Sequence, residues 1–559
     1  MTSTIDTVLN YHERTKHYLD RYARGPEYMD WASQPDPFRR YEGAPRIALE
    51  QGDNSRGPLY RDLFSSPVIP STITYQTISR LFYYSMALSA WKKIPDGVAW
   101  PLRVNPSSGN LHPTESYLII GEQALPSIKE GLYHYNSYYH ALELHRRFGK
   151  HLWTELAGQI QENGFLIGLS SIYWREAWKY GERAYRYCQH DVGHALGAVT
   201  IAAASLGWGA ELVDSLTDNA IAILLGIEDQ TGTEAEHADC LVVVYPKNKT
   251  DEIEIKKHHV LENVTTNTLN KFQNIAPLGK INKLSESHQK WPIIDEVSLA
   301  AKKMQAPDAN IADRLSKLPP KAGDLPQCNK TAFEIIRQRR SAVSMDGETD
   351  MDRPTFFSML QRLQYQKSIP FECLPWTPNV SLFLFVHRVR DLEPGLYVLV
   401  RHASHETSLR RSINPDFLWK KTQEGYIEKM RFYLLAPQDV RYEAKVISCH
   451  QDIAADGVFS LGMLARFDDI RDKGAYFYPR LFWETGLIGQ LLYLEAEAAD
   501  MRSTGIGCFF DDAMHQVLGI TDQSWQSLYH FTVGGPREDK RIQTYAAYEH
   551  LDSLEPGLK

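Results

Sequence analysis

The sequence predicts an α+β protein in which two diverged copies of one unit are fused in a single chain. Residues 377–399 repeat the pattern of residues 105–135, in which a proline and a turn lead into a strand, a spacer and a Gly-Leu-Tyr tripeptide. Residues 476–507 likewise repeat residues 185–209, where an aromatic approach and an acidic residue precede a glycine, a long helix and a Gly-x-Gly turn. Because a fused pair is the single-chain version of a two-fold symmetric dimer, we expect the halves to form an intrachain pseudo-dimer.

Composition excludes several classes of protein. The 559 residues are 43% hydrophobic and 23% charged, an ordinary globular mixture that can bury a large core without disulfide or metal staples. The net charge of −8 argues against a nucleic-acid binder, which would carry a basic stripe. The six cysteines include no Cys-x-x-Cys pair, which disfavours a zinc ribbon and suits a reducing compartment. The charged N-terminal segment lacks the apolar core of a secretory signal, and no long apolar run predicts a membrane span, so we expect a cytoplasmic protein without membrane partners.

Shifts in composition predict five segments along the chain. They are an N-terminal arm (1–60), a first unit (61–246), a linker with a helix (247–325), a second unit (326–546) and a C-terminal tail (547–559). The arm is polar, aromatic and proline-bearing, and the linker contains a proline-rich tether, so neither is expected to form a globular domain. One helix, residues 294–305, is expected to interrupt the linker.

Residue patterns place the main elements of the first unit. Residues 77–91 carry apolar side chains at helical spacing and predict a helix. Residues 115–121 and 238–246 are β-branched and aromatic runs near turn residues, which predicts two strands. Residues 195–209 are rich in small side chains and predict a closely packed helix that ends at the Gly-x-Gly turn.

A short polar loop before the strand at 115–121 is the first candidate ligand site. The segment PSSGN begins with a proline that fixes φ and continues with small residues whose backbone N–H groups and hydroxyls are available. Such a loop suits a flat ligand with polar edges, although an ordinary Ser-Gly-Asn turn also explains the pattern. The candidate binding residues are Pro106, Ser107, Ser108 and Asn110.

Two basic groups in the second unit are candidates for holding a phosphate. Residues 332–347 predict a helix that carries Arg339 and Ser341, and an arginine beside a hydroxyl suits a phosphate through charge-assisted, forked hydrogen bonds. A second group follows two glycines near the C-terminus and comprises Arg537, Lys540 and Arg541. The alternative is that both groups lie on solvated faces, because the sequence does not show whether they converge.

A third segment offers groups for proton transfer. Residues 174–194 predict a helix on which Lys179, Arg183 and Tyr187 share a face at four-residue spacing. A lysine beside a tyrosine supplies two groups whose pKa values burial or a neighbouring charge can shift. The alternative is an amphipathic surface helix held by salt bridges.

The same stretch contains a pair of histidines four residues apart. His190-Asp191-x-x-His194 has the histidine spacing of a helical zinc site, but the intervening acid is aspartate instead of glutamate. A glycine in the stretch weakens the helix, and no third ligand is evident downstream. Packing or substrate contact is therefore favoured over metal binding.

Three segments together resemble the nitroreductase-like flavoenzyme superfamily. PSSGNLHPTE resembles the loop that contacts FMN there, and RQRRSAVSMDG resembles the Arg-x-Ser phosphate-binding helix. WKYGERAYRY resembles the SagB-type, or azoline dehydrogenase, subgroup, whose Lys-Tyr pair is matched here by Lys179 and Tyr180. The resemblance covers residues 60–546 and implies FMN as the cofactor and, in each half, a mainly antiparallel sheet flanked by helices.

The resemblance also implies how the halves share a site. In the superfamily a homodimer holds FMN between subunits, one giving the Pro-Ser-Ser loop and the other the arginine-serine helix, a turn beside the flavin and C-terminal basic residues. Here the first half has the loop and the second half has the arginine and the serine, although Val343 replaces a further basic residue. The remaining cofactor-binding residues are expected to be Arg339, Ser341, Gly507, Cys508, Phe509, Lys540 and Arg541. We expect one FMN site between the halves and a degenerate second one.

The resemblance implies an FMN-dependent oxidoreductase in which hydride passes through flavin N5 and Lys179 or Tyr180 moves a proton. One version oxidises an azoline in a peptide to the aromatic azole. Another reduces nitro compounds, quinones or activated alkenes with NAD(P)H as co-substrate. A non-catalytic flavin-binding scaffold and a metal hydrolase built on the histidine pair are further alternatives. The expected partner is a small molecule or a peptide, and further homo-oligomerisation stays open.

Overall fold

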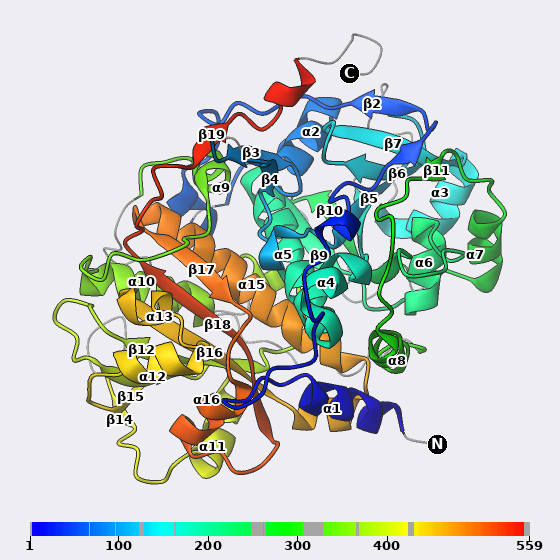
Figure 1. Cartoon of the computed structure of the whole chain (residues 1–559). Helices are drawn as coiled ribbons and strands as arrows, with labels where there is room; N and C mark the ends of the chain where they lie inside the picture. The colour runs from blue at the N-terminus through cyan, green and yellow to red at the C-terminus, as the bar shows by residue number, and fades with distance from the viewer. Residues whose placement is uncertain are drawn as a thin grey trace.

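Two antiparallel sheets, with a pair of long helices between them, organise the molecule (Figure 1). A computed structural model describes residues 3–552 apart from 66, 96, 122–127, 161–163, 248–260, 262–263, 306–327, 365–367 and 423–429. Within these described ranges, no helix has the length and apolar character needed to cross a membrane. The predicted α+β class, with two sheets flanked by helices, is confirmed.

The first half is built on a seven-stranded sheet whose neighbouring strands are all antiparallel. In spatial order the strands are β2 (Arg46–Ala48), β7 (Ala141–Arg147), β6 (Gly131–Asn136), β5 (Thr114–Ile120), β8 (Phe165–Ser171), β10 (His237–Pro246) and β9 (Trp208–Leu212). Helix α5 (Ala184–Ser205) covers one face, and the other is covered by α3 (Lys150–Ala157), α6 (Asp218–Leu225) and α7 (Thr266–Gln273). Because both faces are covered, β5 reads as an uninterrupted buried run.

The second half repeats this arrangement. Its seven strands, again all antiparallel, are β14 (Lys420–Lys421), β15 (Phe432–Ala436), β13 (Gly395–Leu399), β12 (Val380–Val386), β16 (Phe459–Arg466), β18 (Trp525–Gly534) and β17 (Arg502–Ile506) in spatial order. Its helices are α9 (Ala332–Gln338), α10 (Arg353–Gln364), α11 (Ala403–Ser412), α12 (Arg441–Ile447), α13 (Ile453–Asp456), α14 (Asp468–Lys473), α15 (Phe477–Ala498) and α16 (Asp511–Leu518). Six strands follow the same chain order in the two sheets, and the edge strands β2 and β14 differ, so the chain contains two diverged copies of one fold.

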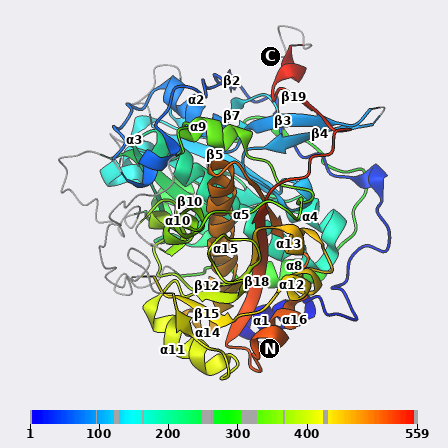
Figure 2. The same cartoon turned by 90° about the vertical axis from the view of Figure 1, so that its left-hand side faces the viewer.

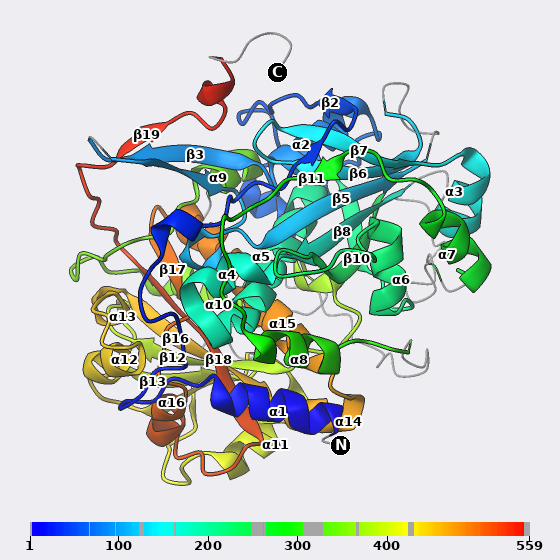
Figure 3. The same cartoon turned by 45° about the vertical axis from the view of Figure 1, so that its right-hand side comes forward.

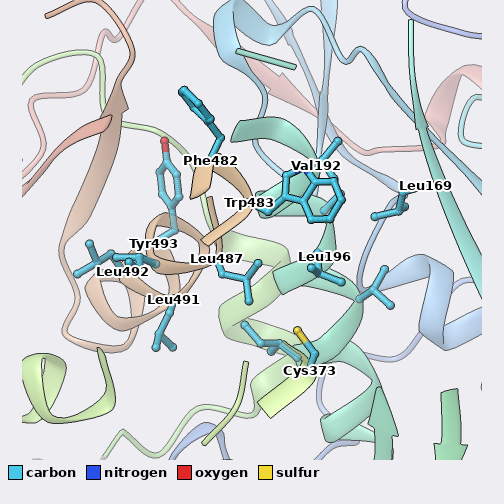
Figure 4. Close-up of a cluster of buried hydrophobic side chains, with 14 of the residues drawn as sticks. Leu169, Val192, Leu196, Cys373, Phe482, Trp483, Leu487, Leu491, Leu492 and Tyr493 are labelled. Atoms are coloured by element: carbon cyan, nitrogen blue, oxygen red, sulfur yellow. The ribbon is translucent and has the colours of Figure 1, made fainter. Parts of the chain in front are cut away.

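Helices α5 and α15 form the contact between the two halves. Both are buried almost throughout and run against each other at the centre of the molecule. Their backbones come closest where Gly193 meets Gly486, since a Cβ added to Gly193 would lie 2.3 Å from the carbonyl oxygen of Trp483. Around this crossing, Val192 and Leu196 of α5 lie beside Trp483 and Leu487 of α15 (Figure 4). The two halves therefore share one hydrophobic core.

The N-terminal arm and the expected linker carry helices that play equivalent parts. Helix α1 (Thr4–Arg14) and helix α8 (Pro292–Ala300) lie side by side (Figure 3). After α1, the backbone N–H of His17 donates to Asp511 of the second half at 2.9 Å. After α8, the backbone N–H of Lys303 donates to Asp218 of the first half at 2.8 Å. Each half thus has a leading helix whose C-terminal end docks on the other half.

The described part of the expected linker packs on the first half. Helix α7 buries Phe272 in the outer hydrophobic cluster, and β11 (Lys280–Ile281) pairs with β1 (Tyr41–Glu42) of the arm. The helix expected at 294–305 runs from Pro292, whose fixed φ suits the first helical position, to Ala300. Residues 248–260, 262–263 and 306–325 of the expected linker lie outside the described residues, and its boundaries stay a prediction.

The C-terminal segment crosses in the opposite direction. It leaves β18 and reaches the first half, where β19 (Gln543–Tyr545) pairs with β3 (Leu88–Lys93), itself paired with β4 (Ala99–Arg103) (Figure 2). The buried hydroxyl of Tyr548 accepts the backbone N–H of Leu88 at 3.1 Å. The rest of the expected tail, residues 553–559, lies outside the described residues. Both chain ends therefore lie on the opposite half, which is the exchange expected of a fused dimer.

Several predicted elements differ in length from the observed ones. The helix expected at 77–91 is wrong beyond α2 (Tyr75–Tyr83), because the N–H groups of Met86 and Ala87 both turn back to the carbonyl of Phe82 and end the helix. The following residues form β3. The predicted strands at 115–121 and 238–246 correspond to β5 and β10. The helix expected over 195–209 is α5, which ends at Ser205 just before Gly207, whose φ is +75°.

Candidate functional site

A cavity of about 770 Å³ lies between the two halves. The first half contributes the polar loop that precedes β5, and the second half contributes the segment after α9 (Ala332–Gln338), strand β17 and the segment after β18. Of the predicted site residues, those that line it are Pro106, Ser107, Ser108, Asn110, Tyr180, Arg339, Ser341, Gly507 and Cys508. The fold thus brings together residues from both halves, as the division of motifs predicts.

The polar loop of the first half is hydrogen-bonded to Asp191, a buried acid on α5. The backbone N–H of Ser108 donates to the carboxylate of Asp191 at 3.0 Å, and the Ser108 hydroxyl lies 3.0 Å from the same oxygen. Gly109, Asn110 and His112 all have positive φ, so the loop turns sharply. The side chain of Asn110 spans this turn, donating to the carbonyl of Pro101 at 2.8 Å. The loop is therefore a fixed cradle.

Asp191 is completely enclosed, and its charge state depends on pH. Burial raises the pKa of Asp191 to about 7, although hydrogen bonds from Ser107 and Ser108 lower it. In the unfolded chain the carboxyl group has an ordinary pKa of about 4. Between these two values the folded protein holds a proton that the unfolded chain has released, so the free energy of unfolding falls as the pH rises.

The stabilising contribution of protonated Asp191 is complete below about pH 4 and is lost as the pH rises through about 7, by up to about 4 kcal/mol. We expect Asp191→Asn to flatten this part of the pH profile of the urea unfolding midpoint between pH 4 and pH 8. Asp239, another buried acid whose pKa burial raises to about 7, lies outside the cavity. Asp239→Asn should leave the Asp191 component in place, and an Asp191→Asn profile identical to wild type would contradict the assignment.

Arg339 joins the two halves at the edge of the cavity. It follows α9 with an extended backbone, so the prediction that it lies within a helix is wrong, because α9 ends at Gln338. Its guanidinium donates to the carbonyl groups of Arg103 and Val104, at 3.0 and 3.1 Å, just before the polar loop. Arg339 is 3% exposed, and its remaining Nη1 group has no hydrogen-bond partner. A buried donor without a partner is costly, so an acceptor bound at Arg339 would be stabilised.

Ser341 lies two residues further on, at the same wall. Its hydroxyl is 2.9 Å from the hydroxyl of Tyr493, which in turn accepts the backbone N–H of Gly505 at 3.0 Å. Tyr493 comes from α15 and also lies under the guanidinium of Arg339, 5.0 Å from its ring centre. The sequence analysis missed Tyr493, because no local motif marks a tyrosine within an apolar helix as part of a polar site.

Other cations also line the cavity. The additional basic lining residues are Lys92, Arg103, Arg340, Arg502 and Arg537. Burial lowers the pKa of Arg340 to about 9, and the neighbouring arginines 339 and 337 add to the decrease. Of the C-terminal basic group, Arg537 lines the cavity, whereas Lys540 and Arg541 do not. Arg541 is exposed and pairs with Asp539 at 2.7 Å.

The turn after β17 also lines the cavity. The carbonyl of Gly507 accepts the Tyr187 hydroxyl at 3.1 Å and a guanidinium N–H of Arg183 at 3.2 Å. Cys508 lines the cavity, but Phe509 is buried outside its lining and stacks on His530 at 4.3 Å. Tyr187 also lines the cavity, and the sequence analysis considered it only for its helical spacing.

Lys179 and Tyr180 end helix α4 (Tyr173–Tyr180) instead of lying within one long helix. The chain changes direction between α4 and α5 at Gly181, whose φ is +55°. The position favours glycine because a Cβ there would also collide with the backbone of the N-terminal arm. The predicted shared helix face is therefore wrong. Tyr180 lines the cavity beside Gly109, and exposed Lys179 has its Nζ 5.3 Å from the Tyr180 ring centre.

A buried carboxyl group lies behind this pair. Glu176 is fully buried, and neither of its carboxylate oxygens has a hydrogen-bond partner. Burial raises the pKa of Glu176, nearby Asp191 raises it further, and Lys179 opposes the shift. Burial also raises the pKa of Tyr180, with Glu176 adding to that increase. The surroundings therefore favour neutral Glu176 and neutral Tyr180.

The histidine pair on α5 packs against the second half. His190 Nδ1 lies 3.0 Å from the Thr485 hydroxyl, and His194 Nε2 lies 3.1 Å from the Tyr529 hydroxyl. Over the residues that the structure describes, no group of three potential metal ligands occurs. The interpretation favoured from the sequence, packing or substrate contact, agrees with these contacts, and His194 also lines the cavity.

Comparison with known families gives the class of the protein. The Nitroreductase family matches the chain twice, over residues 97–244 and 397–535, which together make up more than half of the chain. The chain therefore belongs to the Nitroreductase family. The two matched segments fall in the two halves, one on each sheet.

Particular relatives agree with this assignment. A crystal structure from Anabaena variabilis, named as a nitroreductase, has a TM-score of 0.66 at 22% identity and covers 96% of this chain and 100% of its own. Protein MJ1384 of Methanocaldococcus jannaschii, also named as a nitroreductase, is 29% identical over 130 residues, 22% of this chain and 64% of that protein. The trifolitoxin-processing protein TfxB of Rhizobium leguminosarum bv. trifolii is 28% identical over 148 residues, 25% of this chain and 39% of that protein. The chain thus matches less than two thirds of the length of either curated relative.

Proposed function

We propose that the protein is an FMN-dependent oxidoreductase with one FMN site in the cavity between its halves. The observation that carries this proposal is the division of the cavity wall. A fixed loop with polar edges comes from the first half, and the cations Arg339, Arg340, Arg502 and Arg537 come from the second half. FMN combines a flat ring that has polar edges with a phosphate, so its two parts match the two walls.

The donor set fits this cofactor. The partnerless Nη1 of Arg339 and the nearby Ser341 hydroxyl would hold the phosphate, with Arg340 and Arg502 adding positive charge. The loop from Pro106 to Asn110 would contact the ring through backbone groups and short side chains. When bound, the flavin supplies hydride transfer at N5.

The loop of the second half that corresponds to the polar loop of the first half has different surroundings. Glu484 on α15 corresponds to Asp191 and accepts the N–H of Asn379 at 2.9 Å, but it is also paired with buried Arg401. Trp376 stands in that loop and is 9% exposed, packed near Trp483. The second half therefore has a buried tryptophan and a buried ion pair where the first half has the polar loop and Asp191. This difference supports a single cofactor site.

The stoichiometry of FMN tests the proposal. We expect saturation at about one FMN per chain, because among the described residues a single pair of walls combines the loop with the cations. The measurement is equilibrium dialysis of the purified chain with FMN, followed by heat release and absorbance. Saturation near two per chain would contradict the single site, and failure to bind FMN would overturn the proposed function.

Lys179 and Tyr180 are proposed as the proton-transfer groups. Tyr180 faces the loop of the cavity, and the flexible chain of Lys179 places an ammonium beside it. Because burial keeps Tyr180 neutral, it can donate a proton or a hydrogen bond, while Lys179 exchanges protons with solvent.

We expect Lys179→Ala combined with Tyr180→Phe to keep bound FMN and to lower turnover by about a hundredfold or more. Neither side chain is one of the cations that line the cavity, so flavin content should match wild type. The two single variants, assayed by stopped-flow flavin reduction and reoxidation, separate the two contributions. Full turnover by the double variant would remove both residues from the mechanism.

For the substrate, we propose an azoline-containing peptide that is oxidised to the azole. The Lys-Tyr pair matches the azoline dehydrogenase subgroup, and one relative is named as a toxin-processing protein. The test incubates the FMN-loaded protein with an azoline peptide and follows loss of two hydrogens by mass spectrometry. Anaerobic flavin reduction by NADH or NADPH, with no change in the peptide, would instead favour the nitro, quinone or alkene reductase. A bound flavin that reacts with neither would favour the scaffold.

A further inference from the structure

Two cysteines from separate elements meet at the edge of the candidate cofactor cavity. Cys508 lies in the turn between β17 and α16, and Cys449 lies in the connection between α12 and α13. Their sulfur atoms are 3.0 Å apart, and both residues are free and partly exposed. Cys508 lines the cavity, and its backbone carbonyl accepts the Gln451 amide N–H at 3.0 Å. The pair is therefore held together and lies between the cavity and solvent.

The arm of the first half supplies a histidine to this pair. His17 lies near Cys508 and lowers the pKa of its thiol, and the His17 Nδ1 accepts the backbone N–H of Ala23 at 2.9 Å. Neutral His17 therefore carries its proton on Nε2. The hydrogen bond between the two sulfurs is the main reason why the pKa of Cys508 is lowered and that of Cys449 is raised, and His17 and Arg183 also lower the pKa of Cys508.

The other cysteines in the described part of the chain lack this arrangement. Cys188, Cys240 and Cys373 are buried, and burial raises the pKa of each thiol. Cys328 is partly exposed, as the pair is, but it does not line the cavity. A lowered thiol pKa, partial exposure and a second sulfur within reach are the features of a reactive dithiol.

We propose that Cys449 and Cys508 form a redox-active dithiol that exchanges an electron pair with the flavin in the cavity. This inference rests on the proposed FMN site. It gives the protein a second electron entry, in which a small dithiol reduces the oxidised pair and the pair reduces the flavin.

The electron and proton balance of the exchange is complete. Two S–H bonds break and one S–S bond forms, which releases two electrons and two protons. Both electrons and one proton go to the oxidised flavin, and the second proton leaves to solvent through His17. The sulfurs must approach by about 1 Å to reach the S–S bond length of about 2.05 Å, which lies within the reach of two side-chain rotations. The reverse reaction restores both thiols when reduced flavin is the donor.

The first experiment uses the full chain without added flavin. After oxidation in a glutathione redox buffer, the proteolytic digest should contain one linked peptide pair, Cys449 with Cys508, and thiol counting should fall from six to four per chain. Cys328→Ser should retain the linkage, whereas Cys508→Ser should lose it. A digest without this linkage at any buffer potential would overturn the proposal, whatever the outcome of FMN binding.

The second experiment uses the FMN-loaded chain under anaerobic conditions. Oxidised wild type should consume four electrons per FMN in a dithionite titration, two for the flavin and two for the disulfide. Cys449→Ser and Cys508→Ser should consume two, and Cys328→Ser should consume four. Dithiothreitol should reduce the flavin at least about tenfold faster in wild type and Cys328→Ser than in the pair variants.

These outcomes separate the two hypotheses. A linked peptide in a chain that binds no FMN would overturn both the FMN site and the exchange with flavin. Bound FMN with two electrons consumed by every variant would overturn the dithiol alone and leave the proposed function standing. Each pair variant replaces one sulfur by an oxygen. The flavin content of each variant, compared with that of wild type, serves as the control for folding.

Discussion

Gly193→Ala should destabilise the protein more than any other single methyl addition on α5. A Cβ at this position would lie 2.3 Å from the Trp483 carbonyl oxygen and 2.8 Å from the Gly486 Cα. Both obstacles are backbone atoms of α15, so no side-chain rotation relieves the clash, and the helices must separate. Overpacking of this kind costs about 1–3 kcal/mol, and we expect the upper end of that range or more, since the helix pair supports both halves.

Gly197 provides the matched control on the same helix. A Cβ there would lie 2.9 Å from the Gln490 Cβ and 3.0 Å from its Cγ, a milder overlap than the 2.3 Å approach at Gly193. Both substitutions gain about 1 kcal/mol of helix propensity, so the difference between their urea unfolding midpoints reports the additional cost of the closer approach to backbone. We expect Gly197→Ala to cost less than Gly193→Ala, and Gly486→Ala, whose Cβ would lie 2.3 Å from the His190 carbonyl oxygen, to behave like Gly193→Ala. Equal midpoints for the two α5 variants would show that the crossing tolerates separation.

The duplication was predictable from sequence because each copy repeats a local order of turn, strand and glycine. The close approach at Gly193 was not, because a glycine within a helix gives no sign of which backbone it faces. The same limit applies to the leading helices. Helix α8 is equivalent to α1 in its docking, yet the two share little sequence pattern, so residues 294–305 were interpreted as part of a linker.

The candidate site shows a similar division between local and distant information. The loop from Pro106 to Asn110 and the cation Arg339 were predictable, because each belongs to a short motif whose chemistry is local. The buried partner of the loop, Asp191, appeared only within a histidine motif, because its role depends on the Ser108 N–H from 83 residues away. The break at Gly181 depended on the passing backbone of the N-terminal arm, which helical periodicity cannot register.

Arg339→Ala should release the cofactor while the chain stays folded. Arg339 lines the cavity and its Nη1 has no hydrogen-bond partner, so under the proposed function FMN would lose a charge-assisted, hydrogen-bonded contact to its phosphate. Hydrogen bonds to charged groups contribute about 1.5–3 kcal/mol, which corresponds to a Kd about ten to a hundred times higher. Arg339→Lys should recover part of the affinity, because an ammonium keeps the charge and loses the fork. Equilibrium dialysis with FMN measures both effects.

Arg339 also donates hydrogen bonds to two carbonyl groups of the first half, so Arg339→Ala can lower FMN affinity by weakening the contact between the halves. A control variant has to separate this effect from the loss of the phosphate contact. Arg337, two residues earlier, also donates to the first half, to the Leu88 carbonyl at 2.7 Å, and it lies outside the cavity lining. We therefore expect Arg337→Ala to weaken the contact between the halves by a comparable amount and to leave the Kd for FMN within about twofold of wild type. If both variants lost FMN equally, the arginine would act by holding the halves together, and the phosphate would have to lie against Arg340, Arg502 or Arg537 instead.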